Sequence, residues 1–159
     1  MSELTTQSLV SRRALCIGIL AVLSAPAGVR ATSFKVLVHK DPNCGCCSGW
    51  VKHLEAAGFS VKIEDTNDLA SIRNRLGVPA GLNACHTAEI EGYIVEGHAP
   101  VAAIRKLLEE RPTAVGIAVH GMPAGSPGMG GNPRQYSVVL FGPDFQRAYM
   151  EFLGNEQIG

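Results

Sequence analysis

Apolar and polar positions in the first part of the chain alternate in a pattern that predicts strands and helices in turn. Residues 34–39 are apolar and β-branched and predict a strand, and residues 59–63 alternate and predict a second strand. Between them, residues 47–57 carry apolar side chains at a 3.6-residue spacing, which predicts a helix with one buried face. Gly58 then stands where helices commonly end.

The same pattern continues through the middle of the chain. Residues 68–76 predict a second helix, and residues 85–90 and 93–95 predict the two strands of a hairpin. Residues 100–110 predict a third helix that starts with a proline in its first turn. The order β-α-β-α-β-β-α is that of a thioredoxin-like domain, so we expect an α/β fold of this type.

The composition changes after the third predicted helix. Residues 121–131 are rich in glycine, proline and methionine and have no periodicity, which predicts a loop. Residues 136–141 predict one extra C-terminal strand. Residues 145–153 show no pattern that decides between helix, strand and loop. The chain contains no internal repeat.

The N-terminus carries the features of an export signal. Arg12 and Arg13 precede a short apolar run, residues 14–25, which is followed by small residues. This run is shorter than the stretch of about 20 apolar residues that spans a bilayer. The arginine pair also resembles a twin-arginine signal, so the export route stays open. An uncleaved membrane anchor is the alternative interpretation.

We expect cleavage after Ala31, with Ala27 as the alternative position. Residues 1–31 then form a signal peptide, and residues 32–159 form one exported domain without stable membrane insertion. The whole chain has 14 basic and 14 acidic residues. Cleavage removes three arginines and one glutamate, which leaves 11 basic and 13 acidic residues and a net charge of −2. No basic stripe remains, which argues against nucleic acid as a partner.

Three of the five cysteines fall within four residues: Cys44, Cys46 and Cys47. Thiolates are preferred ligands of soft metals such as Cu(I), and the start of a helix favours thiolate over thiol. Cys85 is distant in sequence, but a thioredoxin-like fold would place it opposite this loop. We therefore expect a four-thiolate metal site. The simpler interpretation of Cys85 is a buried free cysteine on a strand.

Export to an oxidising compartment leaves two other interpretations of these cysteines open. Cys44 and Cys47 have the spacing of a redox-active disulfide, so the chain is alternatively a thiol–disulfide oxidoreductase. Cys46 or Cys85 would then act as the resolving thiol. The third interpretation is a small binding domain stapled by two disulfides and free of metal.

Methionine and histidine side chains are further candidate ligands. Met122 and Met129 lie in the glycine- and proline-rich loop, and thioethers suit Cu(I) better than zinc. Ordinary anchoring of the loop explains these methionines equally well. His86 follows Cys85, and His98 precedes the third predicted helix. A surface position is the more common explanation for each histidine.

A fixed order of short motifs covers most of residues 32–159. The motifs are Cys44-Gly45-Cys46-Cys47, Trp50, His53-Leu54, Gly58-Phe59, Gly77-Val78-Pro79, Cys85-His86-Thr87, Gly92-Tyr93, Glu96-Gly97-His98, Gly121-Met122-Pro123 and Gly125-Ser126-Pro127-Gly128-Met129. In this order they resemble the CopG-type family of exported copper-resistance proteins. One departure is His120, where that family's pattern has proline.

The resemblance implies a thioredoxin-like fold and cysteine-based copper binding in the periplasm. It assigns the ligands to Cys44, Cys46, Cys47 and Cys85. We therefore expect a copper-binding protein that holds Cu(I) rather than zinc and contributes to copper resistance or homeostasis. Its partners would be copper ions and other periplasmic copper-handling proteins. Storage, transfer and a redox role for the copper all remain open, and an enzymatic role would be that of a copper or thiol oxidoreductase.

Overall fold

The computed structural model describes residues 33–159, so the expected signal peptide lies outside the described residues. In chain order the elements are β1 (Lys35–Lys40), α1 (Gly45–Ala56), β2 (Ser60–Asp65), α2 (Leu69–Leu76), the 3-10 turn η1 (Ala80–Leu82), β3 (His86–Ile90), β4 (Tyr93–Glu96), α3 (Val101–Glu110), β5 (Gly116–Ala118), β6 (Gln135–Gly142), β7 (Phe145–Leu153) and β8 (Glu156–Gln157). None of the described helices is long and apolar enough to cross a membrane.

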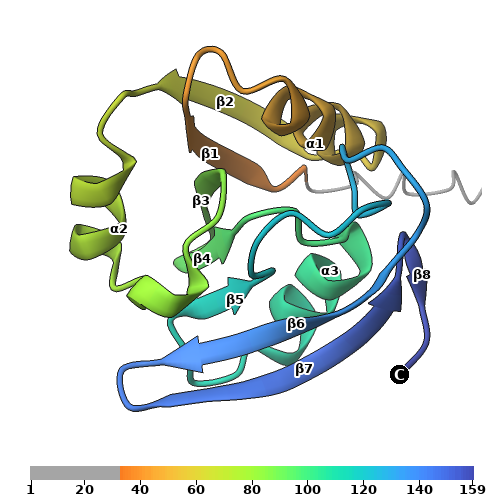
Figure 1. Cartoon of the computed structure of the whole chain (residues 1–159). Helices are drawn as coiled ribbons and strands as arrows, with labels where there is room; N and C mark the ends of the chain where they lie inside the picture. The colour runs from red at the N-terminus through yellow and green to blue at the C-terminus, as the bar shows by residue number, and fades with distance from the viewer. Residues whose placement is uncertain (1–32) are drawn as a thin grey trace, which may run out of the picture. The chain divides into compact units, whose positions relative to one another are not determined.

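All the strands of the described part join one mixed sheet (Figure 1). The sheet has eight strands in the order β2-β1-β3-β4-β5-β6-β7-β8. β1 pairs with β2 and β4 pairs with β5 in parallel, and the other neighbours are antiparallel. With its three helices the domain is α/β, and the predicted order of elements as far as α3 is confirmed.

The sheet buries side chains on both of its faces. Val95 and Ile117 point into the larger core, which also contains the apolar faces of α1 and α3. Their neighbours Ile94 and Ala118 belong to a smaller core on the opposite face, together with apolar residues of the segment after α2. This distribution follows from the two-residue alternation of side chains along a strand.

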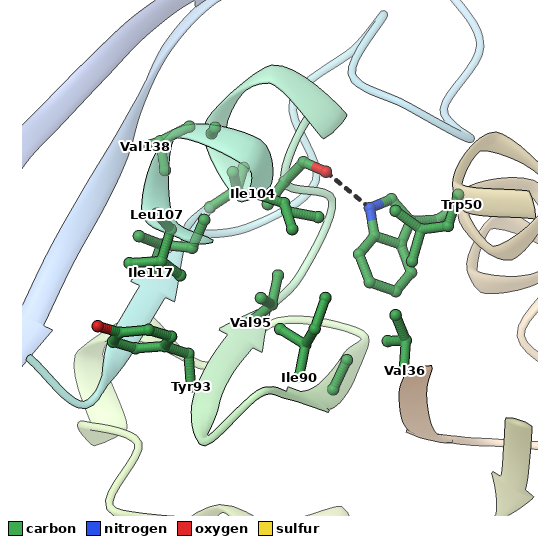
Figure 2. Packing of buried hydrophobic residues seen from close by; sticks show 14 of the residues in the cluster. Val36, Trp50, Ile90, Tyr93, Val95, Ile104, Leu107, Ile117 and Val138 are labelled. Carbon is green, nitrogen blue, oxygen red and sulfur yellow. Dashed lines mark hydrogen bonds between the residues drawn. The ribbon is translucent and has the colours of Figure 1, made fainter. Parts of the chain in front are cut away.

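Trp50 is a fully buried member of the larger core and packs from α1 against its other side chains (Figure 2). Its indole N–H donates a hydrogen bond of 2.8 Å to the carbonyl oxygen of Ala99, just before α3. The buried positions of α1 are Cys47, Trp50, Val51 and Leu54, the spacing of a helix with one apolar face. Packing of Trp50 therefore also fixes the orientation of Cys47, one helical turn earlier.

Two element boundaries near the cysteines differ from the prediction. α1 begins at Gly45, two residues earlier than predicted, so Cys46 and Cys47 both lie in its first turn. β3 begins at His86, which leaves Cys85 in the irregular segment before the strand.

The strand predicted over residues 136–141 is confirmed as β6, but the prediction that only one strand follows α3 is wrong, because four do. β5 has only three residues, too few for a periodic pattern. β7 has four consecutive exposed residues at its start, so the alternation of a half-buried strand is confined to its second half, where Met150 and Phe152 are buried. It pairs along its length with β6, and a register shift occurs between Val138 and Val139.

Candidate metal centre

The cysteine loop is a tight turn that leads directly from β1 into α1. The backbone N–H of Cys44 donates to the carbonyl oxygen of Asp41 over 3.0 Å, and the N–H of Asn43 donates to the Asp41 carboxylate over 2.7 Å. Cys44 has extended backbone angles and occupies the N-cap position of α1. Cys46 and Cys47 follow within the first helical turn, where free backbone N–H groups and the helix dipole favour a negatively charged sulfur.

This turn and the segment before β3 bring four sulfur atoms together. The Sγ atoms of Cys44, Cys46, Cys47 and Cys85 all lie within 4.8 Å of one another. Cys44 and Cys47 form a disulfide, and Cys46 and Cys85 are free thiols. The Sγ of Cys46 is 3.5 Å from that of Cys44, and the Sγ of Cys47 is 3.6 Å from the carbonyl oxygen of Cys85. Cys85 thus lies opposite the loop, where the expected fold placed it.

The protonation of Cys85 reflects its surroundings. Burial, followed by the nearby Cys46 thiol, raises the pKa of its thiol to about 11. Cys85 is therefore protonated at neutral pH in the absence of metal. A metal ion that binds its sulfur has to displace this proton.

His86 and His98 are both fully buried, so the surface interpretation of these histidines is wrong. The His86 ring lies between two others, with its centroid 4.3 Å from that of Trp50 and 5.0 Å from that of His98. Burial lowers the pKa of His86 to about 3 and also lowers the pKa of His98, so both rings are neutral at physiological pH. The group of potential metal ligands in the described residues contains the four cysteines and neither histidine.

These two rings have few hydrogen-bond partners. Nδ1 of His98 lies 2.7 Å from the carbonyl oxygen of Pro127. Both ring nitrogens of His86 and Nε2 of His98 have no partner among the described residues. Buried polar atoms are normally hydrogen-bonded, so this pair is the least satisfied polar group in the described core.

The methionine loop packs against the cysteine turn through a glycine. At Gly128, where φ is +83°, an added Cβ would lie 2.4 Å from the backbone nitrogen of Trp50 and 2.6 Å from the carbonyl oxygen of Cys46. Only a residue without a side chain allows this close approach. Met129 follows directly and is half-buried, whereas Met122 is 56% exposed. The fold therefore places one end of the loop beside the cysteine turn and leaves Met122 open to solvent.

A buried ion pair beside the site was not predicted. The Glu96 carboxylate is fully buried and accepts hydrogen bonds from Arg73 Nε at 2.8 Å, from the Ala84 backbone N–H at 2.7 Å and from the Thr87 hydroxyl at 2.5 Å. Burial raises the pKa of Glu96 above its ordinary value, and the three donors oppose this shift only in part. The sequence feature that could have revealed it is a single acidic residue at the end of the otherwise apolar strand β4, directly before Gly97.

Comparison with known proteins agrees with the geometry of the site. The chain matches a family described as "Protein of unknown function, DUF411" over residues 82–129. Two solved structures, "Copper resistance protein copG- Form 1" and "Form 2", are each 46% identical to it. The first covers 77% of this chain and 99% of its own with a TM-score of 0.72, and the second covers 76% and 98% with a TM-score of 0.71. The chain belongs to the CopG family of copper resistance proteins.

Membership of the CopG family and the cysteine cluster support each other. The resemblance read from the sequence motifs is confirmed by the two solved structures. The four sulfurs that the motifs contribute form a cluster that could bind a metal ion. No curated protein matches the chain.

Proposed function

We propose that this protein binds Cu(I) as cargo through the sulfurs of Cys44, Cys46, Cys47 and Cys85 and so contributes to copper resistance or homeostasis. The observation that carries the proposal is the distance of at most 4.8 Å between any two of these four sulfurs. Four thiolates at such separations can each bind, or bridge, soft cations.

Copper is the metal favoured by the chemistry of the donors. The cluster is made of sulfur alone, and soft sulfur ligands select Cu(I) over harder ions. Zinc also binds four thiolates, so the cysteines alone do not separate the two metals. The relatives named as copper resistance proteins favour copper, and Met129, the residue after Gly128, is a thioether candidate that would favour it further. Met122, His86 and His98 are weaker ligand candidates, since the first is exposed and the histidines stand outside the four-sulfur group.

The disulfide makes copper binding dependent on reduction. While Cys44 and Cys47 are joined, only Cys46 and Cys85 can supply thiolates. A small dithiol can reduce the bond by supplying two electrons and two protons, itself becoming a disulfide. The reduced protein then has four thiols available, which lose their protons as Cu(I) binds.

The remaining parts of the proposal concern fold and location. We propose that the domain is thioredoxin-like, which is supported by the β2-β1-β3-β4 order and by the cysteines at the first strand–helix junction. Residues 1–31 act as a signal peptide, and residues 32–159 work in the periplasm. There the protein exchanges copper with other copper-handling proteins.

A second function is favoured by one observation. The Cys44–Cys47 disulfide lies at the N-terminus of α1, the arrangement that activates sulfur in thiol–disulfide oxidoreductases. As an oxidoreductase, the reduced protein would transfer two electrons to a disulfide substrate and re-form its own disulfide. Cys46, 3.5 Å from the Cys44 sulfur, would be the internal competing thiol.

One anaerobic experiment separates the two functions. The protein is prepared with the disulfide intact and after reduction, and the Cu(I) retained per chain is measured against a competing chelator. We expect reduction to increase both the stoichiometry and the affinity, and protein alkylated after reduction serves as the control. Equal copper binding by the reduced and alkylated forms would contradict the proposal. Rapid reduction of a peptide disulfide by copper-free protein would favour the oxidoreductase.

A further inference from the structure

Cys85 is the one cysteine of the cluster that does not lie at the start of α1. The other three lie at the start of α1, whereas residues 83–85 belong to no helix or strand. The position of Cys85 relative to the other sulfurs therefore depends on whatever fixes this short segment. The hydrogen bonds of Ala84, the residue before Cys85, fix this segment.

Both backbone polar groups of Ala84 are bound to one buried ion pair. Its N–H donates to Glu96 Oε1 over 2.7 Å, and its carbonyl oxygen accepts from Nη2 of Arg73 over 2.5 Å. Arg73 Nε closes the arrangement with a hydrogen bond of 2.8 Å to the same Glu96 oxygen. Glu96 comes from β4 and Arg73 from α2, so two separate elements hold the peptide groups on either side of Ala84.

The surroundings leave this segment little room to move. Gly97, with φ at +72°, packs so closely that an added Cβ would lie 2.7 Å from the Cβ of Ala84 and 2.6 Å from the carbonyl oxygen of Val119. Its N–H donates to the carbonyl oxygen of His86 over 3.0 Å. The second oxygen of Glu96 accepts from Thr87 on β3. Cys85 thus lies between two fixed points, Ala84 and the first residues of β3.

We propose that Glu96 and Arg73 are positioning residues of the cysteine cluster, which hold Ala84 and so keep the Cys85 sulfur beside the sulfur of Cys46. This inference rests on the proposed function, because the cluster matters only if its four sulfurs act together. It also gives a role to the Glu96-Gly97 part of a motif that the copper chemistry leaves unused. Residues that orient metal ligands in this way commonly change metal affinity by about 10–100-fold when they are replaced.

The test compares variants of two side chains, Arg73 and Thr87, that donate hydrogen bonds to the same buried carboxylate of Glu96. Arg73→Lys keeps the charge, but an ammonium group cannot bind both Glu96 and the Ala84 carbonyl in the forked geometry of arginine. Thr87→Val is the matched control, since it removes a hydrogen bond to Glu96 without touching Ala84. The far-ultraviolet spectrum and the Trp50 fluorescence show whether each variant is folded. If Arg73→Lys does not fold, the double variant Arg73→Met with Glu96→Gln replaces it, because it leaves no unpaired buried charge.

The first measurement needs no copper. In the full chain with the Cys44–Cys47 disulfide intact, phenylarsine oxide can bond to Cys46 and Cys85 together, with both thiol protons leaving with its oxygen as water. Mass spectrometry of peptides counts only adducts that bridge these two cysteines, so Cys16 does not contribute. We expect Arg73→Lys to form this bridge at least about tenfold more slowly than the wild type and Thr87→Val to stay within about threefold.

The second measurement is Cu(I) affinity of the reduced chain in competition with a chelator. We expect a loss of about tenfold or more in Arg73→Lys and less than about threefold in Thr87→Val, even where both variants lose similar melting temperature. Equal bridging rates in Arg73→Lys and the wild type would overturn the positioning role. If neither wild type nor variant bound Cu(I) while the bridging rates still differed, the proposed function would fail and the positioning role would stand.

Discussion

The two residues that flank Cys85 belong to two different buried polar clusters, which differ in how well their atoms are hydrogen-bonded. Before it, Ala84 is held by Glu96, whose two oxygens accept three hydrogen bonds. After it, His86 packs against His98 with three ring nitrogens that have no partner among the described residues. The polar side chains of both clusters are fully buried except for the edge of Arg73, whereas Ala84 itself is half-buried.

The difference shows two ways in which a fold supports a site. The Glu96 cluster fixes backbone atoms, because each hydrogen bond defines a direction and the loss of one partner leaves a buried charge. The histidine pair is held by packing against Trp50 and by one bond to the methionine loop. We therefore expect the first cluster to control geometry and stability, and the second to respond to pH.

Removal of the buried carboxylate gives the largest expected effect. Glu96→Ala leaves the Arg73 guanidinium without its partner, and it should lower the free energy of unfolding by about 3–5 kcal/mol. Thr87→Val, which keeps the ion pair, should lower it by only about 1–2 kcal/mol. Urea unfolding at pH 7 measures both values. Similar losses in the two variants would mean that the ion pair contributes no more to the free energy of unfolding than the Thr87 hydrogen bond does.

The second-largest expected loss of stability comes from disturbing the close contact between the methionine loop and α1. Gly128→Ala places a Cβ within 2.4 Å of the Trp50 nitrogen at a positive φ, so it should destabilise the protein by about 2–3 kcal/mol. Gly130→Ala in the same loop is the control, because a Cβ there meets nothing within 4 Å. It should change stability by less than about 0.5 kcal/mol. Equal melting temperatures for the two variants would show that the loop does not pack on the helix in solution.

The histidine pair should make stability depend on pH. Unfolded His86 takes up a proton near pH 6.5, but burial lowers its folded pKa to about 3. Between these values the unfolded state binds more protons, so stability is complete above pH 6.5 and is lost as pH falls towards 3. The slope from one such residue is at most about 1.4 kcal/mol per pH unit.

His86→Phe removes this titration and keeps an aromatic ring beside Trp50. From pH 6.5 to 5.0 the wild type should lose up to about 2 kcal/mol more than the variant, measured by urea unfolding at each pH. Comparison with the variant cancels the contributions of His53 and Glu96. Parallel pH profiles would show that His86 is not buried as a neutral ring.

The smallest expected effect separates the two methionines of the loop. Met129 follows the glycine that touches the cysteine turn, whereas Met122 is mostly exposed. Met129→Leu should therefore reduce the preference for Cu(I) over Zn(II) by a few-fold, and Met122→Leu should leave it unchanged. Competition titrations with both metals measure the preference. A larger effect from Met122 would reverse this assignment.

The parts of the fold that could be predicted were those with a complete periodic pattern. Leu54 and Trp50 in α1, and Ile104 with Leu107 in α3, repeat at helical spacing and are buried as expected. β5 and β7 were not predictable in the same way. The first is too short for any period, and the second has buried apolar side chains only in its second half, while its exposed first half is held by pairing with β6.

The site was predictable to the extent that its chemistry is local. The close spacing of Cys44, Cys46 and Cys47 marks them as candidate ligands in the sequence alone. The expected fold placed Cys85 near them. The burial of His86 and His98 depends on three elements that meet in space, so a single histidine at a strand end gave no sign of it. The hydrogen bonds that Arg73 and Glu96 make with Ala84 use its backbone groups, which every residue type except proline carries, so nothing in the sequence indicated them.

The central claim is that the four cysteines act as one copper site, and Cys85→Ser tests it most directly. The fully reduced wild type and the variant are titrated anaerobically with Cu(I) in competition with a chelator. The account predicts that the variant binds fewer Cu(I) ions or binds them at least about tenfold more weakly, equivalent to ~1.4 kcal/mol or more. Unchanged stoichiometry and affinity would contradict it and confine the site to the cysteines of the loop.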